Sequence, residues 1–502
     1  MASQDTLPLS EVAEEPAAEP RNVRLPGARS VPGTARRVKA IFAPSDMPAW
    51  MAESPESLVA FRGKLYFAVN RGLGRQSQEL WMSDGTETGT LAVKTFAPHL
   101  SPFGTWNSVG ELTVAGDRLF FQVGDATHGR ELWASDGTSA GTLRVKDISP
   151  GAEDSFLSGF TATGSTLLFF RYIPATQTEA ERNELWRSDG TEAGTVLVRD
   201  LGPEFSVSSM RALVGNTLFF VGSDNAHGSE LWKSDGTEAG TVRVRDIQPG
   251  PDSAYPYELR AVGQHVFFTA EDASHGRELW KSDGTEAGTV LVEDLNPGPE
   301  NGGQRLLGAV GGYLYFTTPA PAEQALRLSR LKLDGATQSK LVKTIPNPYA
   351  GQPDADPYIT TYAVTGEKLF FGMAISTPGP APRDVQLWGT DGTAVGTRLL
   401  VRPLSLSDEF QSSLFAVEDF ILFSALGPGS EGLELWMSDG AAESRPLQDI
   451  SPGASSSYPT GFTRVGDSVF FVANDDTDAN QLWVLPVRRL EQRAELRPVG
   501  AQ

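Results

Sequence analysis

The sequence predicts an all-β protein, a closed β-propeller of four-stranded blades. Three observations lead to this prediction. A string of the type ELWxSDGTxxGT recurs along the chain, each copy lies among four short strand-like stretches, and the two ends of the chain are offset by one strand. We expect nine blades, with eight as the alternative.

The repeat is marked by a Trp strand that ends in an Asp-Gly turn. Its copies begin at residues 79, 131, 184, 230, 278, 329, 386, 434 and 481. In the weakest copy, SRLKLDGATQS, we expect Leu331 to take the Trp position, and the last copy keeps Trp483 without an Asp-Gly pair. Gly tolerates a positive φ and Asp can bond its own backbone, so each Ser-Asp-Gly-Thr string predicts a hairpin turn rather than a repeated nucleophile or calcium site.

Each unit also predicts three further strands. An apolar-aromatic triplet precedes the Trp strand, a β-branched run of the Val-x-x-Ile type follows it, and a Pro-Gly-Ser loop leads into another strand-like stretch. We expect the Trp and the triplet Phe to face a neighbouring blade and fill the space between blades. The third residue of the triplet is Phe in all nine units, at Phe67, Phe121, Phe170, Phe220, Phe268, Phe316, Phe371, Phe423 and Phe471.

Counting the parts predicts how the ring closes. There are nine triplets and nine Trp-type strands but only eight downstream Val-x-x-Ile runs. The missing run is at the other end of the chain, in Val38-Lys39-Ala40-Ile41. We therefore expect this N-terminal strand to complete the blade begun by residues 460–487, which would leave no exposed sheet edge at the ends of the array.

These observations divide the chain into three parts. Residues 1–37 predict a disordered tether with an acidic and then a basic half, residues 38–487 a single propeller, and residues 488–502 a C-terminal tail. No apolar run is long enough to span a bilayer, and residues 1–20 do not read as a signal peptide. One hypothesis is that the native precursor carries a signal or lipid-anchor segment ahead of the tether.

Composition excludes several classes of function. The chain has no Cys, which rules out disulfides, thiolate metal sites and a cysteine nucleophile. Its net charge of −21 leaves few Lys and Arg to neutralise phosphates, so nucleic acid is not an expected partner. We expect a monomer.

The repeated ELWxSDGTxxGT string resembles that of the ELWxxDGT repeat proteins of bacteria. The resemblance covers roughly residues 38–487. It implies a β-propeller-like fold and an exported protein, extracellular or on the outer cell surface. It implies nothing specific about chemistry, because a fold does not determine a function.

Two acidic motifs are candidates for binding metal. The Asp-x-x-His-Gly-x-Glu motif occurs three times, in different blades, and each copy has too few ligands for a site, so a turn closed by His is the favoured interpretation. The calcium candidate is the cluster Asp475, Asp476 and Asp478, with a solvated acidic turn as the alternative. Ca²⁺ is the only cofactor that the sequence suggests.

The most informative loops are those that lead into each new blade, because most of them carry an aromatic residue. Aromatic rings on the rim of a propeller can stack on sugars or anchor a protein, and the alternative is that they plug the junctions between blades. The sixth unit, NPGPENGGQRLL, lacks this aromatic residue and would leave a gap. The candidate ligand-binding residues are Trp50, Trp106, Tyr255, Tyr257, Tyr358 and Tyr458, and related positions are Phe156, Phe205 and Phe410.

We therefore expect a non-catalytic binding or scaffold module that recognises a glycan or a protein partner through loops on one propeller face. Enzyme signatures such as GxSxG and HExxH are absent from the sequence. The alternative is an extracellular hydrolase or lyase that gathers carboxylates at the mouth of the channel. A surface protein whose repeats only build a rigid disc is a third reading.

Overall fold

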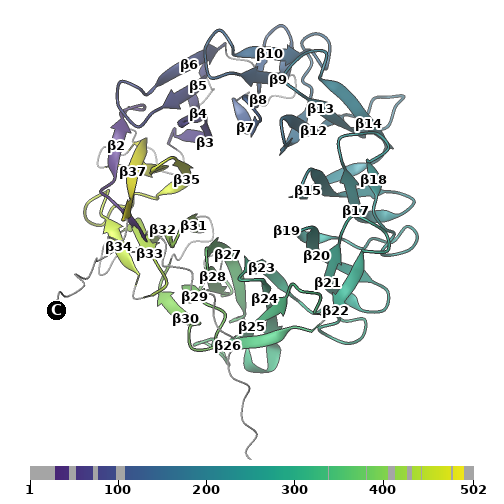
Figure 1. Cartoon of the computed structure of the whole chain (residues 1–502), viewed down its shortest axis with the longest axis vertical. Coiled ribbons are helices and arrows are strands. Elements are labelled where there is room, and N and C mark those ends of the chain that lie inside the picture. Colours follow the sequence, from purple (N-terminus) through teal and green to yellow (C-terminus); the bar gives the residue numbers. More distant parts are fainter. Residues whose placement is uncertain are drawn as a thin grey trace, which may run out of the picture.

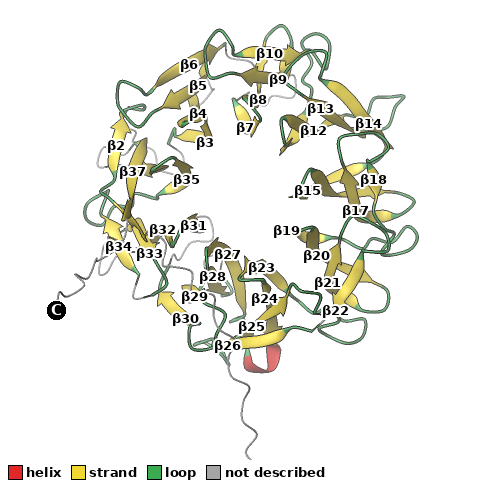
Figure 2. Cartoon of the chain, in the orientation of Figure 1, coloured by secondary structure: helices red, strands yellow, loops and turns green. Residues whose placement is uncertain are grey.

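The computed structural model describes residues 29–43, 52–71, 77–97, 108–336, 338–379, 382–404, 413–426, 432–441, 444–475 and 479–490. Over these residues the chain forms nine antiparallel sheets arranged in a ring, which confirms the nine-bladed β-propeller (Figure 1). Within the described ranges the one helical segment is η1, a 3-10 turn at Pro321–Glu323 (Figure 2).

Blades 1 to 4 are each made of four consecutive strands, with the first strand near the centre of the ring (Figure 1). The strands are β3 (Pro55–Phe61), β4 (Lys64–Arg71), β5 (Ser77–Ser83) and β6 (Leu91–Phe96); β7 (Gly110–Ala115), β8 (Arg118–Asp125), β9 (Gly129–Ser135) and β10 (Leu143–Lys146); β11 (Leu157–Thr163), β12 (Thr166–Ile173), β13 (Arg182–Ser188) and β14 (Val196–Pro203); and β15 (Ser206–Val214), β16 (Thr217–Asp224), β17 (Gly228–Ser234) and β18 (Val242–Arg243).

Blades 5 to 8 repeat the same order. Their strands are β19 (Tyr257–Val262), β20 (His265–Asp272), β21 (Gly276–Ser282) and β22 (Val290–Glu293); β23 (Arg305–Val310), β24 (Tyr313–Ala320), β25 (Ala325–Lys332) and β26 (Lys340–Ile345); β27 (Pro357–Thr365), β28 (Lys368–Ile375), β29 (Asp384–Thr390) and β30 (Arg398–Val401); and β31 (Phe415–Val417), β32 (Phe420–Leu426), β33 (Leu433–Ser438) and β34 (Arg445–Gln448).

Blade 9 joins the two ends of the chain. It contains β35 (Thr460–Val465), β36 (Ser468–Asn474) and β37 (Asn480–Leu490), and β37 pairs with both β2 (Arg36–Lys39) and β1 (Arg29–Pro32). The pairing of Arg37 with Trp483 places the N-terminal strand where the other blades have their fourth strand, as the count of parts predicted. Strand β1 and the end of β37 lie outside the expected bounds of 38–487 and pair with each other, so the ordered blade is longer than the repeat alone indicates.

The core consists of nine apolar clusters, and each cluster fills the junction between two adjacent blades. Nine blades in a closed ring have nine junctions, whereas an open row of nine would have one fewer. The junction between blades 9 and 1 contains Val38, Phe67 and Phe470, which makes it equivalent to the others. Trp133 packs edge-on against Phe96 of the preceding blade at 5.1 Å between ring centroids, so the repeat Trp faces a neighbouring blade as expected.

Two blades differ in register from what the repeat suggests. In blade 3, Phe169 rather than Phe170 lies opposite the repeat Trp, Trp186. In blade 6, Ser329 lies opposite Phe316 and Leu331 lies opposite Leu314. The expectation that Leu331 takes the Trp position is therefore wrong. Strand pairing sets the register in the hairpin between the second and third strands, and it need not follow the position of the Asp-Gly pair.

The Ser-Asp-Gly-Thr turns are held by a repeated set of hydrogen bonds. In blade 1, the backbone N–H and hydroxyl of Thr86 donate to Asp84 Oδ1 at 2.8 and 2.7 Å. The hydroxyls of Ser83 and Thr90 are 2.7 Å apart, and Gly85 N–H donates to Ser83 Oγ at 3.0 Å. The Thr86 side chain lowers the pKa of Asp84. The same bonds recur in blades 2, 3, 4, 5 and 7, so these residues shape the hairpin.

In several blades, a basic residue of the fourth strand forms a hydrogen bond to the next blade. Lys94 Nζ donates to the carbonyl oxygen of Thr142 at 2.7 Å and lies 5.3 Å from the ring centroid of Trp133. Lys39 of β2 makes the equivalent bond to Thr90 at 2.8 Å. The contact between blades 9 and 1, which closes the ring, is thus of the same kind as the contact between blades 1 and 2.

Candidate functional site

Two sets of loops lie at the same end of the blades. One set connects the second and third strands of each blade, and the other leads from one blade into the next. Arg130 N–H, just after the second-to-third connection of blade 2, donates to Asp154 Oδ1 at 2.8 Å, and Ser155 N–H, in the loop leading to blade 3, donates back to the Arg130 carbonyl at 3.0 Å. We call this end of the propeller the loop face. It carries the His motifs and those of the singled-out aromatic residues that the structure describes.

The Asp-x-x-His turns are closed by bonds within each turn. Asp125 accepts the backbone N–H groups of Thr127 and His128 at 2.8 and 2.9 Å, and its carboxylate lies 3.1 Å from His128 Nδ1. His227 and His275 repeat the arrangement. Across the described ranges, no group of three His, Asp or Glu side chains is placed to hold a metal ion. This geometry supports the interpretation of the motif as a turn.

The Glu of the same motif is a buried structural group. Glu131 is fully buried and accepts the backbone N–H groups of Ile148 and Ser149 at 3.0 and 3.2 Å and the hydroxyl of Ser155. Burial raises its pKa to about 7. Glu230 and Glu278 hold the equivalent loops of blades 4 and 5, and burial raises the pKa of each to about 7. Sequence reasoning did not find this role, because the loop that each Glu holds follows it by 17 residues or more.

The calcium candidate falls only partly within the described residues. Asp475 is 2% exposed and pairs with Arg37 at 2.6 Å, which ties β2 to the end of β36. Asp476 and Asp478 lie outside the described residues. The calcium site therefore stays a prediction.

The aromatic candidates occupy different environments. Trp50, Trp106 and Phe410 lie outside the described residues. Phe205 is buried and packs edge-on against Trp232, so it plugs a junction between blades. The most exposed are Tyr255, Tyr257 and Tyr358, which expose 54%, 42% and 37% of their surface. Phe156 and Tyr458 are half-buried.

Two of the exposed tyrosines lie on one groove. The groove has a volume of about 760 Å³ and crosses the inner ends of blades 5, 6 and 7. Tyr257 lines it from β19 and Tyr358 from β27, and blade 6 lies between them. We call it the tyrosine groove. Its lining residues are Tyr257, Glu258, Thr269, Arg277, Gly303, Gln304, Arg305, Thr317, Pro319, Leu326, Pro357, Tyr358 and Ile359.

The groove exists because blade 6 has a glycine where other blades have an aromatic residue. Phe156, Tyr255 and Tyr458 lie one or two residues before the first strand of blades 3, 5 and 9 and have a φ between 45° and 48°, and Gly303 has a φ of 63° at the equivalent place in blade 6. A Cβ atom on Gly303 would lie 2.8 Å from Pro319 Cγ, closer than real side chains approach. The gap that the sequence showed in the sixth unit is therefore the floor of a groove.

Polar side chains lie along the groove between the two tyrosines. Glu258 is 3% exposed and bonded to the Arg305 side chain and to Leu306 N–H at 2.5 Å, and burial is the main cause that raises its pKa. Gln304 donates to the Arg277 carbonyl at 3.3 Å, and within the described residues its Oε1 has no hydrogen-bond partner. Sequence reasoning missed these groups, because two blades that are separate in the sequence contribute them.

The groove does not have the paired carboxylates that a hydrolase or lyase would need. Of its lining residues, Glu258 is the single carboxylate, and its oxygens are taken up by Arg305 and by Leu306 N–H. General acid-base hydrolysis of a glycosidic bond uses two carboxyl groups on either side of the bond. Among its described lining residues the groove therefore has one of the two carboxyl groups that this reaction uses.

No family model matches the chain, and no curated protein matches it. Among solved structures it is similar to prolyl oligopeptidase B from Galerina marginata in its S577A form, with 13% identity and a TM-score of 0.41, over 85% of this chain and 55% of that one. It is also similar to puromycin hydrolase, with 13% identity and a TM-score of 0.37, over 78% and 63%. The β-propeller domain of the Trilobed protease from Pyrococcus furiosus has 12% identity and a TM-score of 0.35, over 69% and 98%.

The chain thus spans a little over half of the prolyl oligopeptidase that it resembles. At this identity and TM-score the similarity carries no argument about activity, and the fold assignment rests on the strand pairing. Within the described residues, no helix is long and apolar enough to cross a membrane.

Proposed function

We propose that this propeller is a non-catalytic binding module that holds a glycan in the tyrosine groove. The observation that carries the proposal is the placement of two exposed tyrosines on either side of a polar floor. A sugar ring has apolar faces that stack on aromatic rings and hydroxyl groups that need hydrogen-bond partners at its edge. The groove supplies both kinds of contact.

The polar groups of the groove favour a neutral glycan. Arg277 is paired with Glu271 at 2.5 Å and Arg305 is paired with Glu258, so the two guanidinium groups add little net positive charge. The chain as a whole carries a net charge of −21, which repels acidic ligands at long range. Guanidinium, amide and hydroxyl groups remain available to bond sugar hydroxyls.

The localisation, cofactor and oligomeric state of the protein are part of the same proposal. The resemblance to the ELWxxDGT repeat proteins supports an exported protein, extracellular or on the outer cell surface, and it rests on the repeated string. The proposal needs neither a cofactor nor a partner subunit. A protein segment is the alternative occupant of the groove, and the experiment below separates the two.

The test is a glycan array probed with the full chain, followed by calorimetric titration of the best neutral glycan. We expect Tyr257→Ala and Tyr358→Ala each to weaken binding at least about tenfold, because each removes a stacking surface. Both side chains are more than a third exposed, so the melting temperature should stay the same.

The matched control is Tyr172→Ala on the same face. Tyr172 packs edge-on against Phe156 in blade 3, away from the groove, and its loss should leave the affinity unchanged. Failure of every glycan to bind, or equal affinity for all three variants, would refute the proposal. Capture of a protein that competes at Tyr257 and Tyr358, with no glycan bound, would assign the groove to the alternative.

A further inference from the structure

A second cavity lies at the opposite end of the blades from the tyrosine groove, where a repeated contact is missing. In most junctions the Gly of the Asp-Gly turn lies against a large side chain of the preceding blade. A Cβ built on Gly284 would be 3.2 Å from Phe219 Cζ, and one on Gly85 would be 3.4 Å from Phe470 Cζ. Gly137, Gly190, Gly236, Gly392 and Gly440 lie in the same way against Tyr66, Phe120, Leu168, Tyr315 and Phe370.

Blade 6 breaks this pattern. A Cβ built on Gly335 would meet nothing within 4 Å, although the preceding blade offers Phe267 at the equivalent position. The cause is the register of β25, where Leu331 lies opposite Leu314, while in blade 5 Ser282 lies opposite the equivalent residue, Val266. Counted from this paired position, the Asp-Gly pair of blade 6 therefore comes two residues further along the chain than the Asp-Gly pair of blade 5. As a result, the turn of blade 6 lies away from the junction.

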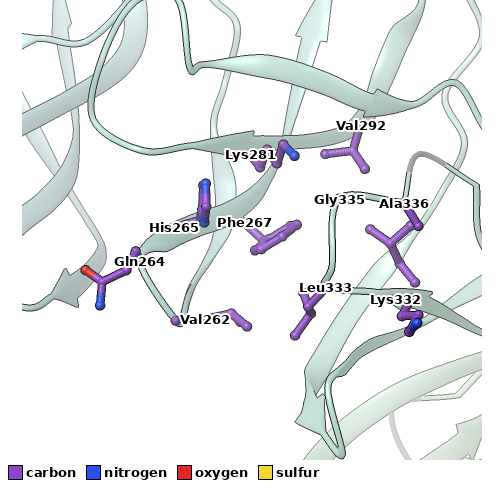
Figure 3. A pocket seen from close by; sticks show the side chains of 12 residues that line it. Val262, Gln264, His265, Phe267, Lys281, Val292, Lys332, Leu333, Gly335 and Ala336 are labelled. Atoms are coloured by element: carbon purple, nitrogen blue, oxygen red, sulfur yellow. The ribbon is translucent and has the colours of Figure 1, made fainter.

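The displaced turn leaves a cavity of about 280 Å³ between blades 5 and 6. This volume is near the lower end of the range of pockets that hold small ligands. Apolar side chains line it, and Figure 3 shows Val262, Phe267 and Leu333 facing the same space. Val292 and Leu331 complete the apolar wall. We call it the junction pocket.

Basic groups surround the apolar wall. His265, Lys281 and Lys332 line the junction pocket. Lys332 is paired with Asp334 at 2.6 Å. Among the described residues Lys281 makes no ion pair, and the neighbouring carboxylate of Asp283 is bonded to the Thr285 hydroxyl at 2.7 Å. Asp283 also interacts electrostatically with His265, so Lys281 is the basic group that gives the rim of this apolar pocket a positive charge, on a chain whose net charge is strongly negative.

We propose that the junction pocket binds a small amphiphile with an apolar body and one anionic headgroup, such as a medium-chain carboxylate. The apolar body replaces the turn contact that the other junctions have, and burying it removes apolar surface of both partners from water. The carboxylate lies at the rim, where Lys281 donates a charge-assisted hydrogen bond and His265 provides a second ring N–H. This site is separate from the tyrosine groove and does not depend on the glycan proposal.

The test is calorimetric titration of the full chain with octanoate, 1-octanol and octyltrimethylammonium. We expect octanoate to bind with a stoichiometry of one, about tenfold more tightly than octanol, and octyltrimethylammonium not to bind. Lys281→Gln should remove the preference for octanoate over octanol. Ala336→Phe, which places a ring in the pocket from the turn, should abolish binding of both.

The sequence provides a matched control in blade 4. Lys233 stands in the same ELWKSDGTEAGT string as Lys281, but its junction is closed by Gly284 packed on Phe219. Lys233→Gln should bind octanoate as the unchanged protein does. Equal binding of octanoate and octanol would overturn the assignment of the headgroup. The site would be overturned if the unchanged protein did not bind octanoate. It would also be overturned if the Ala336→Phe variant kept both its melting temperature and its octanoate binding.

Discussion

Replacing Glu131 by Gln should remove a pH-dependent part of the stability of the propeller. Glu131 is fully buried, and burial raises its pKa from 4.5 to about 7. In the unfolded chain the carboxyl loses its proton near its ordinary value, while in the folded chain it keeps the proton to a higher pH. The group therefore contributes stability that is fully present below about pH 4.5 and is lost as the pH rises through 7.

The magnitude follows from the difference between the two pKa values. A shift from 4.5 to about 7 corresponds to a free energy of unfolding that falls by about 3 kcal/mol across this pH range for Glu131 alone. Glutamine can take the place of the Glu, because blade 9 has one naturally. Gln481 Oε1 accepts the N–H groups of Ile41 and Phe42 at 2.8 and 3.3 Å, and its amide donates to the Phe42 carbonyl at 2.8 Å.

The assay is urea unfolding at several pH values between 4.5 and 8, followed by circular dichroism. The difference in unfolding free energy between Glu131→Gln and the unchanged protein should shift by about 3 kcal/mol in favour of the variant as the pH rises. Glu286→Gln, on an exposed turn, controls for the loss of one surface charge. The reasoning fails if Glu131→Gln and the unchanged protein lose stability in parallel over the whole range.

Three further substitutions test other parts of the structure. Lys94→Met should lower the free energy of unfolding by about 1–2 kcal/mol, because it removes the hydrogen bond to the Thr142 carbonyl and the contact with the Trp133 ring. An unchanged melting temperature would contradict this. Ser135→Ala should cost about 1–3 kcal/mol, since it removes the acceptor of the Gly137 N–H at 2.9 Å and the 2.7 Å bond to the Thr142 hydroxyl; a loss below 0.5 kcal/mol (about the effect of an ordinary surface change) in urea unfolding would argue against it. Gly303→Val should weaken glycan binding at least about tenfold and lower the melting temperature, because its side chain would meet Pro319; a variant that binds and melts as the unchanged protein does would show that the floor can move.

Much of the fold could be predicted from the sequence because its information is local and repeated. The Asp84 turn uses residues within seven positions of one another, and closure by Val38 follows from counting strand types. The register of blade 6 could not be predicted in this way. The motif suggested Leu331 opposite the triplet Phe, but strand pairing places Ser329 there, and a two-residue shift keeps the same side chains on the same face.

The candidate site was predictable only in part. Tyr257 and Tyr358 stood out as aromatic residues in loops, and the missing aromatic residue of blade 6 was visible in the string of glycines. The sequence did not show that these features form one groove, because Arg277, Gln304 and Tyr358 come from three blades. In the sequence the Glu of the repeat falls within the weak metal motif, and its bonds to a distant loop appear only in the folded chain.

The measurement that tests the central proposal most directly is hydrogen-deuterium exchange of the full chain with and without the neutral glycan selected on the array. If the glycan occupies the tyrosine groove, amides near Tyr257, Arg305 and Tyr358 should exchange more slowly together, in three different blades, while those near Tyr172 do not change. Slower exchange in one of these blades alone, or only elsewhere on the ring, would contradict binding in the groove.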